Sequence, residues 1–163
     1  MIAVTAVSEQ QLRPGDVILY RGTGLYGFAI RVKTWHDVGH VEVYIGDGMA
    51  VASRPGRGKG AQRYPVRLDD TVVAVLRPTQ PIDLALGLAR FDREMAGMSY
   101  GWSDLVAFIG LTYDGHGIVC SSCATWFLRA ANLPIFNREP INAIAPCDFL
   151  QTNLLADVLS EAA

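Results

Sequence analysis

The residues best suited to covalent chemistry are a cysteine and a histidine that lie far apart in the sequence. Cys120 opens the run Cys120 to Asn132, whose apolar residues recur at helical spacing. A thiol in the first turn of a helix faces unpartnered backbone N–H groups and the positive end of the helix dipole, which favours the thiolate. His40 begins a β-type run and could take the thiol proton. Together the two residues predict acyl transfer through a thioester.

A zinc site is the competing chemical class. His36-x3-His40 and Cys120-x2-Cys123 both have acceptable ligand spacings, and together they could supply four ligands. A nucleophilic thiol must be free, however, which a closed four-ligand site does not allow. Because His36 falls in an expected loop and His40 on a strand, we favour the thiol chemistry and expect no metal and no cofactor. Cys147 is most simply a structural residue.

The composition excludes several classes of protein. Of 163 residues, 50% are apolar and 18% charged, which argues against disorder, and the net charge of -2 gives no electrostatic case for nucleic acid. The longest apolar run, Leu105 to Leu111, is far shorter than the roughly 20 residues that span a bilayer. No secretory leader is recognisable at the start, and three cysteines, an odd number, suggest a reducing compartment. The sequence as it stands therefore predicts a cytoplasmic protein, with phage-encoded or exported action as the alternative.

The pattern of elements changes from β-type to helical along the chain. Gly46-Asp47-Gly48 has the chemistry of a hairpin turn between two of the expected strands. We expect strands at Val17 to Tyr20, His40 to Ile45, Met49 to Ala52 and Thr71 to Leu76. We expect helices within Gly22 to Trp35 and at Leu84 to Gly97, Trp102 to Gly110, Cys120 to Asn132 and Cys147 to Leu159. Strands followed by helices predict one α+β domain, residues 1–163, with an antiparallel sheet.

Three short motifs carry a resemblance to a known fold. The segment Gly39 to Gly48, preceded by Gly15 to Leu19 and followed by Val119-Cys120-Ser121-Ser122, resembles the circularly permuted branch of the NlpC-type papain-like hydrolases. That branch includes the YiiX type and the lecithin retinol acyltransferase group. The resemblance covers about residues 12 to 132 and implies a papain-like α+β domain in which the histidine strand precedes the cysteine helix.

The resemblance also implies roles for individual residues. His40 would be the general base, Cys120 the nucleophile, and Tyr100 the aromatic residue before the cysteine helix that contacts substrate. The implied activity is that of a thiol amidase or peptidase acting on bacterial cell-wall peptide. A lipid acyl hydrolase or acyltransferase is the second choice, and a non-catalytic binding module that keeps the fold is the third.

Two positions depart from the family pattern. Relatives often carry a polar residue on the returning strand that orients the histidine, and here Ala52 takes its place. Glu42 shares a strand face with His40 and could substitute, although a neighbour on one strand is poor geometry for this role; Asp114 is another option. Cys123 stands where relatives have an apolar residue, and in papain the later cysteine of Cys-Gly-Ser-Cys attacks, so it competes with Cys120.

A basic segment follows the second strand of the hairpin. Residues 53–67 contain several arginines and a lysine, several glycine or proline breaks and no acidic residue. This composition predicts a mobile solvated loop next to the histidine strand. Its Arg54, Arg57 and Lys59 could contact an anionic substrate or a lipid head group.

Overall fold

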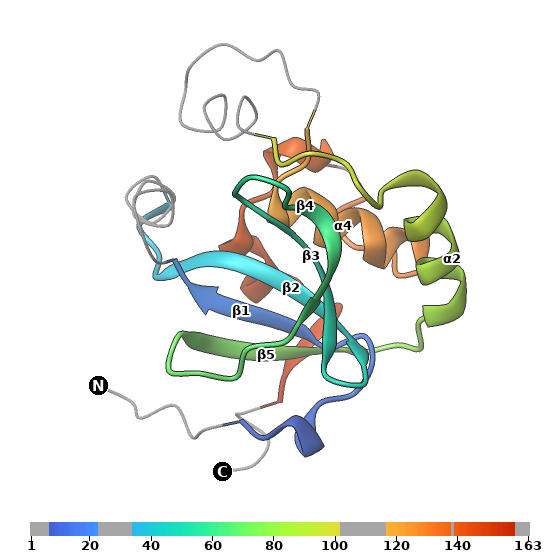
Figure 1. Ribbon diagram of the computed structural model, residues 1–163. Coiled ribbons are helices and arrows are strands. Elements are labelled where there is room, and N and C mark those ends of the chain that lie inside the picture. Colours follow the sequence, from blue (N-terminus) through green and yellow to red (C-terminus); the bar gives the residue numbers. More distant parts are fainter. Residues whose placement is uncertain (1–6, 23–33, 102–116, 138, 159–163) are drawn as a thin grey trace.

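The computed structural model describes residues 7–22, 34–101, 117–137 and 139–158, and its main feature is one antiparallel sheet (Figure 1). The strands lie in the order β4-β3-β2-β1-β5-β6, and neighbouring strands all run antiparallel. The strands are β1 (Val17–Arg21), β2 (Val38–Gly46), β3 (Met49–Arg54), β4 (Gly60–Pro65), β5 (Val72–Pro78) and β6 (Leu155–Asp157). The helices are η1 (Glu9–Gln11), α2 (Leu84–Glu94), α4 (Cys120–Ala130), η2 (Ile141–Ala143) and η3 (Pro146–Gln151). The predicted α+β class is confirmed, with the histidine strand β2 preceding the cysteine helix α4.

Local sequence signals account for the β2–β3 hairpin. Asp47 and Gly48 have φ angles of 50° and 67°. Positive φ at both central residues is what a type I′ turn requires, and Asp-Gly is a favoured pair for it. The turn fixes the register that pairs Val43 with Val51. This hairpin was predicted from the sequence.

The two α-helices begin and end at recognisable caps. The side chain of Asp83 accepts a hydrogen bond from the backbone N–H of Leu86 at 2.9 Å and so caps the start of α2. At the end of α4, Asn132 has a φ of 66°, and the N–H of Leu133 reaches back to the carbonyl of Leu128. This is a Schellman ending. Both helices were expected at these places.

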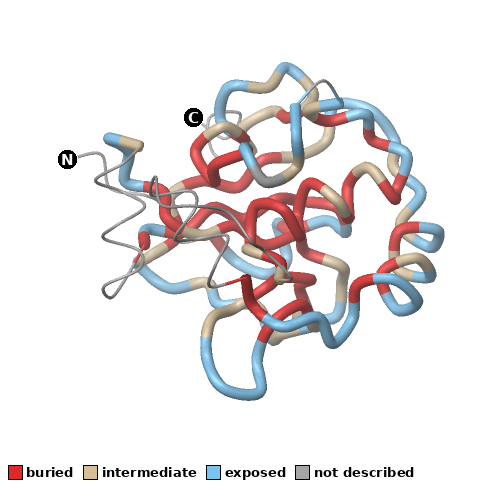
Figure 2. Tube along the Cα trace, turned by 90° about the horizontal axis from the view of Figure 1, so that it is seen from above, coloured by how far each residue is buried: buried red, intermediate tan, exposed pale blue. Residues whose placement is uncertain are grey.

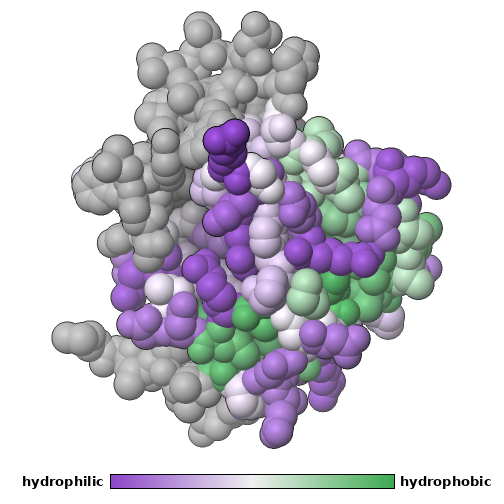
Figure 3. Space-filling model, viewed as in Figure 1, coloured by the Kyte–Doolittle hydropathy of each residue, from purple (hydrophilic) through white to green (hydrophobic). Residues whose placement is uncertain are grey.

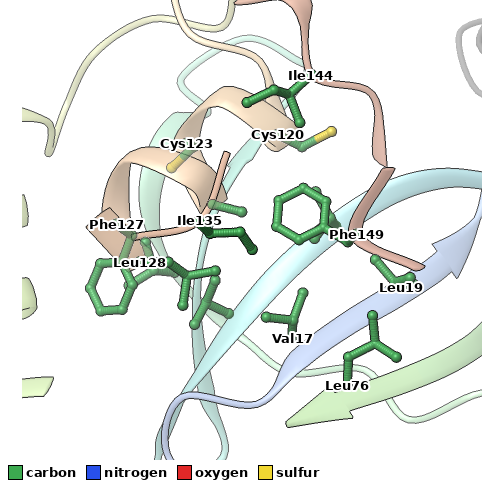
Figure 4. Close-up of a cluster of buried hydrophobic side chains, with 14 of the residues drawn as sticks. Val17, Leu19, Leu76, Cys120, Cys123, Phe127, Leu128, Ile135, Ile144 and Phe149 are labelled. Carbon is green, nitrogen blue, oxygen red and sulfur yellow. The ribbon is translucent and has the colours of Figure 1, made fainter. Parts of the chain in front are cut away.

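The core lies between α4 and one face of the sheet. Buried residues are concentrated in the sheet and in α4, whereas α2 keeps an exposed outer side (Figure 2). Val17, Leu19 and Leu76 from the sheet gather with Phe127 and Phe149 in one cluster (Figure 4). This packing fixes the first turn of α4, and therefore Cys120, against the central strands.

The basic segment is not the mobile loop that its composition suggested. Residues 60–65 form strand β4, which pairs with β3 in continuous register from Met49 opposite Pro65 to Arg54 opposite Gly60. The N–H of Ala61 also donates to the carbonyl of Met98 at 2.9 Å. The glycines and arginines of the basic segment are not typical of a strand, so the sequence did not predict β4. Its stability comes from these non-local partners.

The expected helix at Cys147 to Leu159 is also wrong. Pro146 opens a 3-10 helix, η3, and the chain then adds the short strand β6 beside β5. Proline at a first helical turn does not distinguish a 3-10 helix from an α-helix. The helices expected within Gly22 to Trp35 and at Trp102 to Gly110 fall mainly or wholly on residues 23–33 and 102–116, outside the described residues.

Candidate active site

Cys120 is the first residue of α4 and is almost fully buried. Val119 before it is extended, so the chain turns into the helix directly at the thiol. The first ordinary helical bond is from the N–H of Cys123 to the carbonyl of Val119, at 2.9 Å. The N–H groups that precede it have no acceptor within the helix.

His40 lies on β2, paired opposite Tyr20 of β1, and the negative charge of Cys120 acts on its imidazole. Residues that are far apart in sequence thus meet because α4 packs across β2. The imidazole is mostly buried, with 16% of its side chain exposed, and its ring lies 5.8 Å from that of Tyr20, measured between centroids.

Glu42 is completely buried and lies among three polar side chains from three strands. Its Oε1 is 2.8 Å from Nε2 of His40 and accepts a hydrogen bond from Nε of Arg54 at 2.7 Å. Its Oε2 accepts a hydrogen bond from the hydroxyl of Tyr20 at 3.3 Å. The geometry that looked unfavourable on one strand is therefore present, and Glu42 contacts the imidazole directly.

The charges of this cluster determine its protonation states. Burial opposes protonation of His40, but the negative charge of Cys120, a hydrogen bond with it and the Glu42 carboxylate outweigh burial and raise the pKa of His40 from 6.5 to about 9. Burial would raise the pKa of Glu42, but His40 and Arg54 hold it at about 2, below its ordinary 4.5. At neutral pH His40 is therefore an imidazolium beside the ionised carboxylate of Glu42.

The side chain of Arg54, which we expected to contact substrate, contacts Glu42 inside the site. Nη2 of Arg54 lies 2.7 Å from Oε1 of Glu42 and donates to the carbonyl of Pro65 at 3.2 Å. The guanidinium also lies over the ring of Tyr64, 4.3 Å from its centroid. A hairpin places residues of its two strands side by side, so the opposite charges of Glu42 and Arg54 on the two arms of the hairpin were a signal that sequence reasoning could have used.

Three further predicted site residues, Arg57, Lys59 and Tyr100, lie within the described ranges. Arg57 and Lys59 are exposed in the turn between β3 and β4, and hydrophilic surface covers this hairpin in Figure 3. Tyr100 is buried, and its backbone forms a parallel bridge with Ile118, shortly before Cys120. Asp114 lies outside the described residues.

The segment just before Cys120 is held by close backbone contacts. The hydroxyl of Ser53 donates to the carbonyl of Ile118 at 2.6 Å, and the N–H of Ile118 donates to the carbonyl of Ser99 at 3.2 Å. A Cβ atom at Gly117 would stand only 2.3 Å from Cα of Gly101. Only glycine at position 117 therefore allows the backbone to follow this path into Cys120.

The other two cysteines have different surroundings. Cys123 is fully buried, and burial together with the charges of Cys120 and Glu42 raises its pKa far above the ordinary range. Burial also raises the pKa of Cys147. The sulfur atoms of Cys120 and Cys123 point to different sides of α4 (Figure 4). Of the three thiols, Cys120 is the one whose charge contributes to the raised pKa of His40.

The zinc alternative finds no geometric support. Within the described ranges, no group of three or more histidine, cysteine, aspartate or glutamate side chains is arranged to hold a metal ion. Nδ1 of His36 accepts a hydrogen bond from the N–H of Val38 at 3.3 Å, which is a local turn contact. The four residues with zinc-like spacing are therefore not assembled around one point.

Comparison with curated proteins gives a distant similarity. No protein-family model matches the chain. The chain is 27% identical over 113 residues to the probable lipoprotein peptidase YaeF of Escherichia coli (strain K12), a match over 66% of this chain and 39% of that protein. The chain thus spans about two fifths of the length of this relative. Separately, none of the helices in the described part of the chain is long and apolar enough to cross a bilayer.

Proposed function

We propose that the protein is a cysteine hydrolase of the circularly permuted NlpC-type branch, with Cys120 as nucleophile. The observation that carries the proposal is the buried carboxylate of Glu42 at 2.8 Å from His40, whose imidazole also interacts electrostatically with Cys120 at the start of α4. A thiol at a helix start, a histidine beside it and a third group that orients the histidine form the recurrent arrangement for nucleophilic catalysis. The similarity to a protein named as a peptidase supports the same reaction class.

The reaction follows from the protonation states of the pair. The thiolate of Cys120 attacks the carbonyl carbon of an amide, and the N–H groups of the first turn of α4 stabilise the oxyanion. His40 then gives its proton to the departing amine as the C–N bond breaks and the thioester remains. Water attacks the thioester while His40 takes its proton, the C–S bond breaks, and the acid product leaves the thiolate and imidazolium restored.

Glu42 supports both half-reactions by fixing the imidazole. Because Nε2 is hydrogen bonded to Glu42, Nδ1 is the ring nitrogen left for the thiol. The carboxylate also stabilises the imidazolium that waits to protonate the leaving group. The raised pKa of His40, about 9, keeps this proton available at neutral pH.

We propose bacterial cell-wall peptide as the substrate class, with Tyr100, Arg57 and Lys59 as residues that would contact it. This choice rests on the resemblance of the histidine and cysteine motifs to the NlpC-type hydrolases. Lipid acyl groups are the second candidate, since the same thioester chemistry serves ester and amide acyl donors.

The test combines labelling with turnover. The purified protein is treated with iodoacetamide near neutral pH, and the labelled cysteine is located by mass spectrometry. Parallel samples receive p-nitrophenyl acetate, disaccharide-peptide fragments of peptidoglycan, or phospholipid vesicles, with products identified by mass spectrometry. We expect preferential labelling of Cys120 and hydrolysis of the peptide fragments.

Matched variants decide between the two neighbouring thiols. Cys120→Ala should abolish turnover and rapid labelling, whereas Cys123→Ala should retain most of both, because the Cys123 thiol is buried and protonated. Full activity of Cys120→Ala would overturn the proposal. Uniformly inert thiols would favour the binding-module alternative.

A further inference from the structure

Arg54 carries a permanent positive charge beside Glu42. The other cation of this cluster, the imidazolium of His40, must lose and regain its charge during the reaction. Oε1 of Glu42 contacts both Nε2 of His40 and the guanidinium of Arg54. The imidazolium loses its charge when it protonates a leaving group, and in that state it no longer compensates the carboxylate. A buried carboxylate without a cation is costly and takes up a proton or reorients. Arginine stays charged throughout.

The position of Arg54 is itself fixed by contacts to the adjacent strand. Its Nη2 donates to the carbonyl of Pro65, and its guanidinium lies over the ring of Tyr64. Only 16% of the side chain is exposed. A guanidinium held in one place by a carbonyl, a ring and a carboxylate is not arranged to capture a ligand from solvent.

No other cation is recorded at the carboxylate among the described residues. From β1, the hydroxyl of Tyr20 donates to Oε2 of Glu42, and burial raises the pKa of Tyr20, so this group is a neutral donor. Arg67 lies over the ring of Tyr20, 5.8 Å from its centroid. The charge balance of Glu42 therefore depends on His40 and Arg54.

We propose that Arg54 is a positioning residue that keeps Glu42 ionised and turned toward His40 while the imidazole is neutral, and thereby keeps the imidazole proton on Nε2. This inference rests on the proposed cysteine chemistry. It assigns to Arg54 of β3 a role in the reaction instead of a role in binding an anionic substrate. Glu42 on the histidine strand β2 thus provides the acceptor for Nε2 of His40. Arg54 on the returning strand β3 provides the counterion of Glu42.

Two alkylating reagents separate these roles. Iodoacetamide is neutral and iodoacetate is anionic, and both report the reactivity of Cys120. If Arg54 positions Glu42, Arg54→Met should lower both rates by the same factor, about tenfold or more. Arg54→Lys should restore part of the loss, since it keeps the charge but not the planar fork. A loss confined to iodoacetate would show that Arg54 binds anions and would overturn the inference.

Nitrogen NMR of the imidazole gives a readout that a general loss of stability does not move. In the wild type, the neutral form of His40 should carry its proton on Nε2, and in Arg54→Met the two tautomers should become mixed. Arg63→Met is the matched control, because Arg63 on β4 pairs with the exposed Asp92 at 2.7 Å. It should leave the tautomer and both alkylation rates unchanged. An unaltered tautomer and unaltered rates in Arg54→Met would also refute the role.

A double substitution keeps the test decisive if Arg54→Met fails to fold. Glu42→Gln removes the buried charge that Arg54 compensates, so the double variant Arg54→Met/Glu42→Gln should fold. In the Glu42→Gln background, adding Arg54→Met should change the alkylation rate of Cys120 by less than about twofold. Arg54 acts through Glu42 in this proposal, so its substitution has no further effect once the Glu42 charge is gone. A further large loss would refute the role. Failure of the proposed cysteine chemistry would be seen separately, as wild-type reactivity of Cys120 in His40→Gln.

Discussion

Nε2 of His40 and Oε1 of Glu42 lie 2.8 Å apart although only Val41 separates the two residues on their strand. The pairing of β2 with β1 shifts register between Tyr20 and Arg21, directly beside His40. Such bulges increase the local twist and re-aim side chains, often at active sites. The irregular start of β2 thus accounts for a contact that a regular strand makes poorly.

The charge state of His40 can be measured directly. We expect NMR titration to give His40 a pKa near 9, and a lower value in both Cys120→Ala and Glu42→Gln, because each removes a negative group that stabilises the imidazolium. The larger fall should follow removal of Cys120, whose contribution exceeds that of Glu42. His36 serves as the internal reference in every spectrum. A pKa of His40 that is the same in all three proteins would contradict the cluster.

The same interactions predict how stability depends on pH. His40 has a folded pKa of about 9 against 6.5 unfolded, so its contribution to the free energy of unfolding is complete below about pH 6.5 and is lost as pH rises through 9. The amount is on the order of 3 kcal/mol, at about 1.4 kcal/mol per pKa unit. Urea unfolding of wild type and His40→Gln should therefore give a stability difference that shrinks between neutral and alkaline pH. Parallel pH curves for the two proteins would show that the pair does not form.

Glu42 predicts how the free energy of unfolding depends on pH at the acid end. Its folded pKa of about 2 lies below the ordinary 4.5, so its contribution is present above about pH 4.5 and is lost as pH falls through 2. Acid unfolding of Glu42→Gln should accordingly depend less on pH in this window than that of the wild type. An equal pH dependence in Glu42→Gln and the wild type would show that the acid sensitivity comes from other groups. A variant of the exposed pair of Arg63 and Asp92 serves as the comparison.

Local signals made part of this structure predictable from the sequence. The Asp47-Gly48 turn, the helix from Leu84 and the helix from Cys120 depend on residues close to one another in the chain, and all were expected. The pairing of His40 with Cys120 was expected only through the family resemblance, because no local rule joins distant residues. Strand β4 was missed, since its residues read as a basic loop and its pairing partners lie on β3 and near Met98.

The site shows the same division between local and non-local information. Glu42 was chosen for its place on the face of His40, which period-two alternation gives. The position of Arg54 beside Glu42 was not foreseen, because it depends on the carbonyl of Pro65 and the ring of Tyr64 in the strand that was missed. Missing strand β4 therefore also left the contacts of Arg54 unpredicted.

Two glycines in the β3–β4 region separate backbone strain from steric contact. Gly58 and Gly60 both have positive φ, at 69° and 127°, but a Cβ at Gly58 meets nothing within 4 Å while one at Gly60 would stand 2.2 Å from the carbonyl oxygen of Met98. Gly58→Ala should lower the free energy of unfolding by about 1 kcal/mol. Gly60→Ala should cost at least about 1 to 3 kcal/mol more, because β4 must move away from Met98. Equal losses in urea unfolding would show that residues 97–98 do not cover β4.

The position of Cys120 should depend on Gly117. A Cβ there would stand 2.3 Å from Cα and 2.6 Å from N of Gly101, and Gly117 is not among the glycines with positive φ, so Gly117→Ala tests the contact alone. Relief of the clash must shift the chain that leads into α4, and a displacement of about 1 Å can cost about 100-fold in rate.

The comparison variant for Gly117→Ala is Ser53→Ala. It removes one buried hydrogen bond to the carbonyl of Ile118 at a cost of about 1 to 3 kcal/mol, but it adds no atom that pushes on the chain. We therefore expect Gly117→Ala to lose most of the iodoacetamide reactivity of Cys120 and Ser53→Ala to keep most of it, even when the two have similar melting temperatures. Wild-type reactivity in a folded Gly117→Ala would mean that the backbone contact with Gly101 does not position the thiol.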